Sequence, residues 1–129
     1  MNSKILIVDD EAKLREVLCD YFRSKGDLPV EAEDGRQALQ LLDENEFDAV
    51  LLDIMMPGLD GLNVCRAVRG TNDVPIIFLT ALSAEEDKLL GYELGADDYV
   101  TKPFTMSVLY AKTMALIKRN RKNVLSGDR

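Results

Sequence analysis

The chain has 129 residues, 47% of them hydrophobic, with a formal net charge of −7, two cysteines and no histidine. This length suits a single domain with its own core, and the acidic charge disfavours direct binding to nucleic acid or to an anionic membrane. The missing histidine excludes a Ser-His catalytic pair, His-ligated zinc and a phosphohistidine carrier, while two cysteines without a secretory signal indicate reduced, packed thiols in a cytoplasmic protein.

Apolar runs and amphipathic stretches alternate five times along the chain. The expected strands are residues 4–8, 28–32, 48–53, 74–79 and 98–101. The expected helices are residues 11–25, 37–44, 62–69, a fourth that opens with a capping box at Ser83 and ends at Gly95, and 105 to about 120. Pro29 places the second strand at a sheet edge, because proline has no N–H to donate. The alternation predicts an open, mainly parallel α/β sheet with right-handed crossovers.

Polar residues follow the ends of these strands. Asp9 and Asp10 come after the first, Asp53 ends the third, and Thr80 and Lys102 follow the fourth and fifth. The carboxyl ends of parallel strands share one edge of a sheet, so we expect these five side chains to converge there. Three crowded aspartates repel one another unless a cation neutralises them, and an oxygen-only ligand set favours Mg²⁺.

This set of residue types fits phosphoryl transfer to an aspartate. An aspartate can accept a phosphoryl group as an acyl phosphate, and the transferring group mainly needs positive charge around its oxygens. Lys102 supplies a second cation and Thr80 a hydrogen-bond donor. Singly, each residue has an ordinary reading, such as a helix cap for Asp10, but their convergence favours a functional site. Four other aspartates are read as turn or surface residues: Asp48, Asp60, Asp97 and Asp98.

Five short motifs occur in order and at a characteristic spacing. They are Ile7–Glu11, Leu51–Gly58, Asp60-Gly61, Pro75–Ala81 and Lys102–Phe104. From Lys4 to Arg119 the chain resembles the receiver domains of bacterial two-component response regulators. The resemblance implies a flavodoxin-like (CheY-like) five-stranded parallel sheet of order 2-1-3-4-5, with five helices on both faces. It also implies a receiver domain over residues 1–121 and the start of a linker or tail over 122–129.

The resemblance assigns roles to the strand-end residues. Asp53 is implied as the phosphoacceptor, with a sensor histidine kinase as the donor. The implied Mg²⁺ ligands are Asp10, Asp53 and the main-chain carbonyl of Met55, with Asp9 acting partly through water. Lys102 is implied to pair with the phosphoryl oxygens, and the Lys102–Pro103 peptide bond is implied to be cis. Thr80 and Tyr99 are implied to move as a switch. Such a domain catalyses its own phosphorylation and dephosphorylation and is not an enzyme acting on a separate substrate.

Residues Leu94–Phe104 are similar to the OmpR/PhoB subfamily, whose members carry a C-terminal DNA-binding domain. This implies the receiver of a transcriptional regulator, with a stand-alone receiver acting through protein contacts as the alternative. It also implies a phosphorylation-dependent homodimer through the fourth helix, fifth strand and fifth helix. The charged positions of that interface match Lys88, Asp97, Asp98 and Lys112. Val108 stands where the family has a glutamate, which predicts a weaker dimer.

Three other functions are less consistent with these residues. A haloacid dehalogenase-type hydrolase needs a second aspartate where this chain has Met55. A dinucleotide-binding domain needs a G-x-G-x-x-G motif after the first strand, and the sequence has none there. A degenerate receiver that acts only as a binding module is disfavoured, because all five strand-end residues with chemical roles are present.

Overall fold

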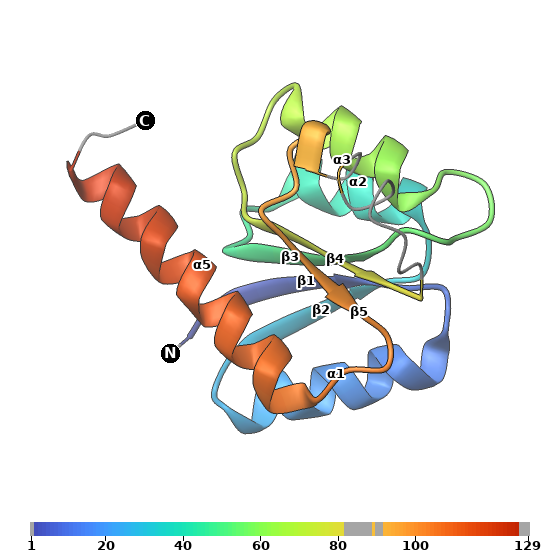
Figure 1. The fold of residues 1–129 in the computed structure, drawn as a ribbon, viewed down its shortest axis with the longest axis horizontal. Coiled ribbons are helices and arrows are strands. Elements are labelled where there is room, and N and C mark those ends of the chain that lie inside the picture. Colours follow the sequence, from blue (N-terminus) through green and yellow to red (C-terminus); the bar gives the residue numbers. More distant parts are fainter. Residues whose placement is uncertain (1, 82–88, 90–91, 127–129) are drawn as a thin grey trace.

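A computed structural model describes residues 2–81, 89 and 92–126, with side chains up to residue 122. The strands are β1 (Lys4–Val8), β2 (Leu28–Ala32), β3 (Ala49–Asp53), β4 (Ile76–Thr80) and β5 (Asp98–Thr101). The helices with assigned bounds are α1 (Ala12–Ser24), α2 (Gly35–Glu44), α3 (Gly61–Arg69) and α5 (Met106–Ser126). The strands form one parallel sheet of order β2-β1-β3-β4-β5, which confirms the expected topology (Figure 1).

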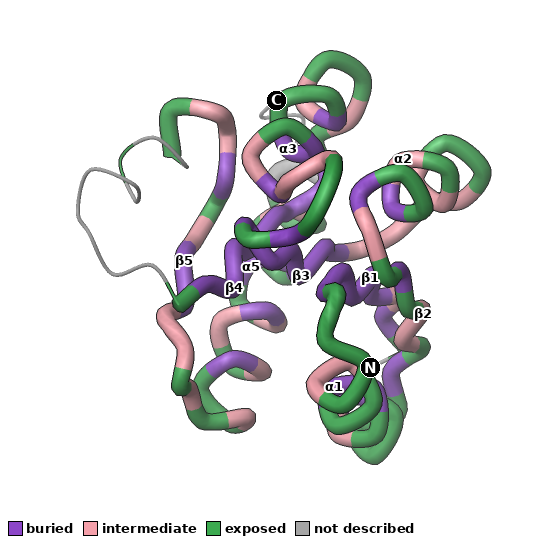
Figure 2. Tube along the Cα trace, turned by 90° about the vertical axis from the view of Figure 1, so that its right-hand side faces the viewer, coloured by how far each residue is buried: buried purple, intermediate pink, exposed green. Residues whose placement is uncertain are grey.

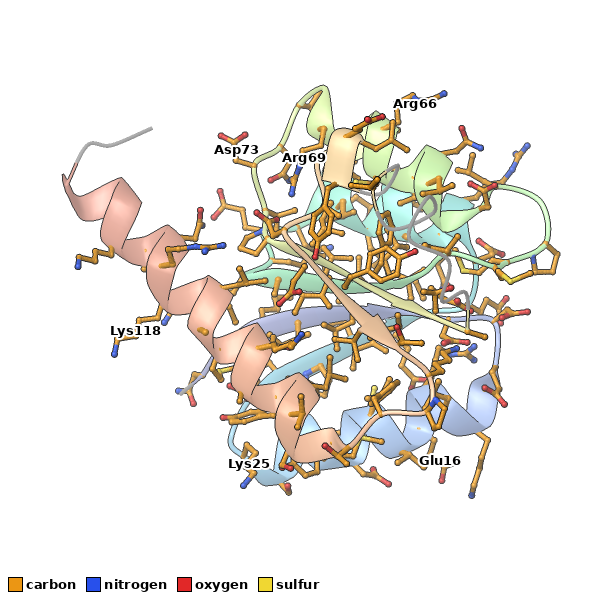
Figure 3. All side chains as sticks on the ribbon, in the orientation of Figure 1. Glu16, Lys25, Arg66, Arg69, Asp73 and Lys118 are labelled. Carbon is orange, nitrogen blue, oxygen red and sulfur yellow. The ribbon has the colours of Figure 1, made fainter. Side chains whose placement is uncertain are left out.

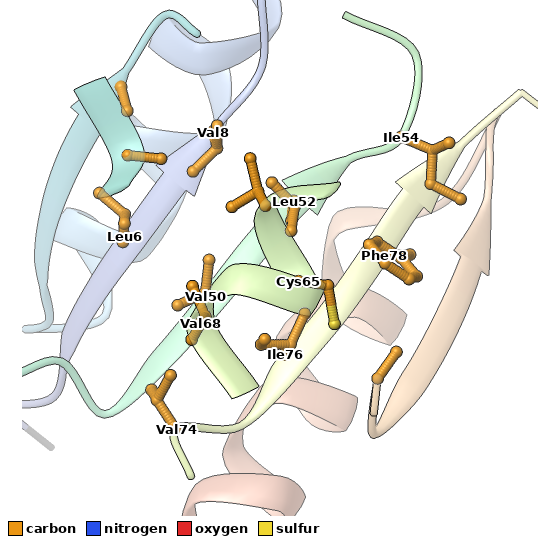
Figure 4. Close-up of a cluster of buried hydrophobic side chains, with 14 of the residues drawn as sticks. Leu6, Val8, Val50, Leu52, Ile54, Cys65, Val68, Val74, Ile76 and Phe78 are labelled. Carbon is orange, nitrogen blue, oxygen red and sulfur yellow. The ribbon is translucent and has the colours of Figure 1, made fainter. Parts of the chain in front are cut away.

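Helices cover both faces of the sheet (Figure 1). Successive side chains of a strand point to opposite faces, so each central strand supplies two cores. Leu6, Val50 and Phe78 pack with α2 and α3, in the cluster shown in Figure 4. Ile7 and Leu51, one position away along the strands, pack with α1 and α5. Figure 2 shows the result, in which the central strands are almost wholly buried and the outer helix surfaces exposed.

The edge position of β2 agrees with the proline argument. Pro29 lies opposite Ile5 of β1, and β2 pairs with no other strand among the described residues. Cys19 and Cys65 are free and buried, as expected for packed thiols. Charged side chains lie on the outside of the helices; Figure 3 labels Glu16 and Lys118 among them. Over the described part of the chain, no helix combines the length and apolarity needed to cross a membrane.

Two expectations about the helices need correction. Four helices have assigned bounds among the described residues, where five were expected. The expected fourth, opening at Ser83, falls largely on residues 82–88 and 90–91, outside the described residues, although Leu89, Tyr92 and Glu93 are helical. The last helix was expected to end near Asn120 but continues to Ser126, because no glycine or proline interrupts the chain before Gly127.

Candidate functional site

The five strand-end residues meet at one edge of the sheet. β1 and β3 are hydrogen-bonded neighbours, and β4 and β5 follow in order, so Asp9, Asp53, Thr80 and Lys102 stand at the ends of four adjacent strands. Carboxylate oxygens of Asp9, Asp10 and Asp53 all lie within 4.8 Å of one another. Asp9 and Asp53 are buried, whereas Asp10 is exposed, so the acidic cluster opens to solvent on one side.

Asp9 is held at four of its atoms. Its main-chain N–H donates to the carbonyl of Ala32 at 3.2 Å, which continues the pairing of β1 with β2. Its Oδ1 accepts from the main-chain N–H of Glu11 at 2.9 Å, and this turn leads the chain into α1. Its Oδ2 accepts from Lys102 Nζ at 3.0 Å. Its carbonyl oxygen accepts from Arg15 Nη1 at 2.6 Å. Asp9 is therefore a fixed point of the site.

Asp53 carries the most perturbed carboxyl group of the site. Its side chain is 6% exposed; Oδ1 accepts from the main-chain N–H of Met55 at 3.2 Å, and Oδ2 lies 3.6 Å from Lys102 Nζ. Burial raises the pKa of this carboxyl to about 6, and the charge of Asp9 adds to the rise. Lys102 and the Met55 hydrogen bond oppose it. At neutral pH the site thus holds negative charge that its own residues only partly compensate.

Lys102 bridges the two buried carboxylates. Burial alone would lower the pKa of its ammonium group, but the hydrogen bond to Asp9 and the negative charges of Asp53 and Asp9 outweigh burial, so the net shift is upward. Its main-chain N–H donates to the carbonyl of Thr80 at 2.7 Å, which ties the end of β5 to the end of β4. The Lys102–Pro103 peptide bond is cis, as expected.

The loop after β3 turns back tightly beneath Asp53. The Gly61 N–H donates to the carbonyl of Ile54 at 3.0 Å, and a Cβ at Gly61 would lie only 2.2 Å from the main-chain oxygen of Asp53. Gly58 has a φ of +75°, a conformation that glycine adopts without strain. Asp60 caps α3 by accepting from the Asn63 N–H at 2.9 Å. The helix cap made by Asp60 and the close approach of Gly61 to the backbone of Asp53 explain why an Asp-Gly pair ends the loop after β3.

Thr80 and Tyr99 lie on the same face of the sheet. Phe78 is two residues before Thr80 on β4, and it stands opposite Tyr99 on β5. The rings of Phe78 and Tyr99 pack edge to face with centroids 5.9 Å apart, and Tyr99 is only 7% exposed. Thr80 is fully buried at the site. We call Thr80 and Tyr99, which the sequence predicts to move as a switch, the two switch residues; Phe78 is a neighbour of both on this face.

Other aspartates prove to be structural anchors. Asp60 caps α3, and Asp48 accepts from the first main-chain N–H of β1 at 2.7 Å. Asp97 accepts both from Arg69 Nη2 and from the first main-chain N–H of β4, each at 2.8 Å. Asp98 lies 3.6 Å from the ammonium of a lysine on α5. The reading of Asp97 as a simple turn or surface residue was incomplete, because its long-range partners are not visible in the sequence.

Arg15 and Glu31 were missed by the sequence reasoning. The sequence pattern places Arg15 in a helix and Glu31 in an edge strand, and neither pattern predicts that the two side chains meet. Their side chains pair at 3.1 Å beside the acidic cluster, and Arg15 reaches the carbonyl of Asp9. The available signal was weak: a cation one turn after an acidic pair, and a carboxylate near the end of the neighbouring strand.

A parallel α/β domain with an acidic strand-end cluster and a facing lysine has the chemistry to bind a cation and a phosphoryl group. The family model for the response regulator receiver domain matches residues 5–114, and the chain belongs to this family. Receiver domains are phosphoacceptors of histidine kinases and bind Mg²⁺ at an acidic pocket.

Relatives and solved structures agree with this family. The chain is 49% identical over 123 residues to the probable transcriptional regulator ycf27 of Guillardia theta, covering 95% of this chain and 48% of that protein. It therefore spans about half the length of this curated relative. A Francisella response regulator receiver domain matches with a TM-score of 0.88 and 38% identity, over 92% of this chain and 99% of that one. The Thermotoga maritima OmpR/PhoB homolog DrrB matches with a TM-score of 0.83 and 36% identity, over 93% of this chain and 54% of DrrB.

Proposed function

We propose that Asp53 accepts a phosphoryl group from a phosphohistidine of a sensor histidine kinase, with Mg²⁺ bound beside it. The observation that carries this proposal is the buried Asp53 carboxyl, which lies within 4.8 Å of two further aspartates and 3.6 Å from Lys102 Nζ. In the transfer, a carboxylate oxygen of Asp53 bonds to phosphorus and the phosphorus–nitrogen bond to the donor imidazole breaks. The product is an acyl phosphate on Asp53.

The acidic cluster fits Mg²⁺ by the chemistry of its donors. It offers three carboxylates and no sulfur or imidazole. Burial, with the charge of Asp9 adding to it, raises the pKa of Asp53, and a bound cation would stabilise the ionised carboxylate. Asp10, Asp53 and the main-chain carbonyl of Met55 would hold the ion, with Asp9 acting partly through water. When bound, Mg²⁺ supplies positive charge next to the phosphoryl oxygens during transfer.

The remaining strand-end residues act on the phosphoryl group and report its presence. Lys102 pairs with the phosphoryl oxygens, because its ammonium already faces the Asp53 carboxylate. Thr80 donates a hydrogen bond to the phosphoryl group from the end of β4. Tyr99 responds on the same face of the sheet, where its ring packs on Phe78 two residues below Thr80. This pairing of positions supports a switch that runs from Thr80 to Tyr99.

We further propose that the domain is the receiver of a transcriptional regulator. The relative from Guillardia theta is about twice as long as the matched region and is described as a transcriptional regulator. Phosphorylation is expected to form a symmetric homodimer through the face containing β5 and α5. The stand-alone receiver is the alternative, and the coding sequence that follows residue 129 distinguishes the two.

Intact mass after incubation with acetyl phosphate and Mg²⁺ tests the phosphoacceptor. We expect one added phosphoryl group, which Asp53→Asn or chelation of Mg²⁺ abolishes. Asp34→Asn is the matched control, because Asp34 is another aspartate that accepts from a main-chain N–H, at the start of α2, and it is not a member of the acidic cluster. Labelling of Asp53→Asn at the level of Asp34→Asn would disprove the assignment.

A further inference from the structure

Arg15 and Glu31 form a clamp on the loop between β1 and α1, which carries the acidic pair Asp9–Asp10. We define this clamp as the ion pair between Arg15 Nε and Glu31 Oε1 at 3.1 Å together with the hydrogen bond from Arg15 Nη1 to the Asp9 carbonyl at 2.6 Å. The Arg15 side chain is only 12% exposed, whereas that of Glu31 is 48% exposed. The planar guanidinium binds two partners at once, Glu31 through Nε and the Asp9 carbonyl through Nη1, so its orientation next to the cluster is fixed.

The atom that Arg15 contacts determines what the clamp can do. The Asp9 carbonyl belongs to the peptide unit that joins Asp9 to Asp10, and a peptide unit is planar. A hydrogen bond that fixes its oxygen also fixes the orientation of the whole plane, and with it the direction in which the Asp10 side chain leaves the backbone. Asp9 has three further contacts of its own, but Asp10 is exposed and gains its orientation through this peptide.

The clamp is anchored on the strand that already holds the loop. The Asp9 N–H donates to the carbonyl of Ala32, and Glu31 is the residue before Ala32 on β2. At the other end, the Arg15 N–H donates to the Glu11 carbonyl in the first turn of α1. The loop between β1 and α1 is thus connected to both of its neighbours, β2 and α1, through one arginine.

We infer that Arg15 is a positioning residue for the Asp9–Asp10 pair, with Glu31 orienting its guanidinium; this rests on the proposed function. Arg15 contacts the acidic pair through the main-chain carbonyl of Asp9 and not through a carboxylate oxygen. Its effect is geometric, because its charge is paired with Glu31 and adds little net charge to the cluster. Partners that orient metal ligands in this way commonly account for 10- to 100-fold in metal affinity.

Charge and geometry make opposite predictions for Arg15→Ala. Removing a cation near an acidic site should tighten Mg²⁺ binding if only its charge matters. Removing the clamp should weaken binding if the orientation of the acidic pair matters. We expect Arg15→Ala to raise the Mg²⁺ dissociation constant about 10-fold. Arg15→Lys keeps the charge but not the fork, so it should fall between Arg15→Ala and wild type.

The test is a Mg²⁺ titration of each purified protein, followed by NMR at the Asp10 amide and by calorimetry. Arg23→Ala is the matched control, because Arg23 is a cation at the other end of α1 whose ion pair among the described residues is with exposed Asp20, at 3.5 Å. Its dissociation constant should equal that of wild type. Thermal unfolding without Mg²⁺ shows which variants are folded, and Arg15→Lys keeps the inference testable if Arg15→Ala does not fold.

The possible results separate the two proposals. Weaker binding in both Arg15 variants, with normal binding in Arg23→Ala, supports the positioning role. Adding Glu31→Gln to Arg15→Ala should then cause little further loss, since both changes break one unit. If wild type binds Mg²⁺ but Arg15→Ala binds it equally or more tightly, the positioning role is wrong while the proposed function stands. If wild type binds no Mg²⁺, the proposed function fails and this inference fails with it.

Discussion

Replacing Asp53 with asparagine should stabilise the Mg²⁺-free protein. The carboxyl pKa rises from 3.8 to about 6 in the folded chain. Because the folded pKa lies above the unfolded value, the ionised carboxylate destabilises the fold. This cost begins as the pH rises through 3.8 and is complete above about 6. Asparagine keeps the oxygen that accepts from Met55 but carries no charge, so Asp53→Asn avoids the cost.

The expected gain can be worked out from the shift. One pKa unit corresponds to about 1.4 kcal/mol, so Asp53→Asn should raise the free energy of unfolding by about 3 kcal/mol at pH 7.5. At pH 5 the same two pKa values give about half of that gain. Solvent screening reduces the figure little, because the Asp53 side chain is 6% exposed. Mg²⁺ should stabilise wild type more than Asp53→Asn, because a ligand of the folded state adds to its stability.

Urea titrations with EDTA, at pH 5 and pH 7.5, measure this difference in the free energy of unfolding. Asp34→Asn serves as the control, because asparagine caps a helix about as well as aspartate and should change stability little at either pH. The buried-charge reasoning is wrong if Asp53→Asn is no more stable than wild type at pH 7.5. It is also wrong if the gain is the same at both pH values.

Three further perturbations test other parts of the site and the expected dimer. Lys102→Ala should keep the fold and Mg²⁺ binding but lose the NMR shifts that beryllofluoride, a phosphoryl mimic, induces at the two switch residues; an unchanged shift pattern would refute the role of the lysine. Gly61→Ala should lower the free energy of unfolding by about 2 kcal/mol in urea titrations, because its Cβ would meet a main-chain oxygen at 2.2 Å; Gly70→Ala, with its nearest atom at 3.4 Å, should cost less. Val108 is 49% exposed, and Val108→Glu should tighten the beryllofluoride-activated dimer in sedimentation velocity by restoring the glutamate that the subfamily resemblance pairs with Lys88, which lies outside the described residues; a looser or unchanged dimer contradicts this.

The sheet and the convergence of the strand-end residues were predictable because they follow from a short-range pattern. Fully apolar strands alternating with amphipathic helices leave few topologies other than a parallel sheet. Once the sheet is parallel, Asp9, Asp53 and Thr80 must share an edge, whatever the details of packing. Pro29 similarly fixed the edge strand through one missing donor. These arguments need no knowledge of distant contacts.

The features that escaped prediction depend on long-range geometry or on weak end signals. The clamp joins Arg15 to Glu31, 16 residues apart, and depends on the packing of α1 beside β2. The Arg69–Asp97 pair links residues 28 apart. The end of α5 was misplaced because polar, charged residues near a chain end were read as a tail, although lysine and arginine favour helix.

The contacts of Lys102 suggest a route by which a charge change on Asp53, as proposed, would reach the ends of β4 and β5. Lys102 Nζ lies between Asp9 and Asp53, at 3.0 and 3.6 Å, so the two carboxylates compete for one ammonium. A phosphoryl group on Asp53 adds negative charge and changes that competition. The main-chain N–H of Lys102 is hydrogen-bonded to the Thr80 carbonyl, which couples the ends of β4 and β5.

That coupling has a defined direction. Thr80 is buried at the end of β4, beside β3 and Asp53. Under the proposed function, a movement of its hydroxyl toward a phosphoryl oxygen would leave space on the face that it shares with Phe78 and Tyr99. Tightly packed interiors do not tolerate an unfilled volume at low cost, so the neighbouring ring is the side chain expected to move. Tyr99 lies on β5, at the face where the homodimer is expected. Under the proposed function, phosphorylation of Asp53 would change the charge that Lys102 meets, and the packing of Tyr99 on Phe78 would carry that change toward β5.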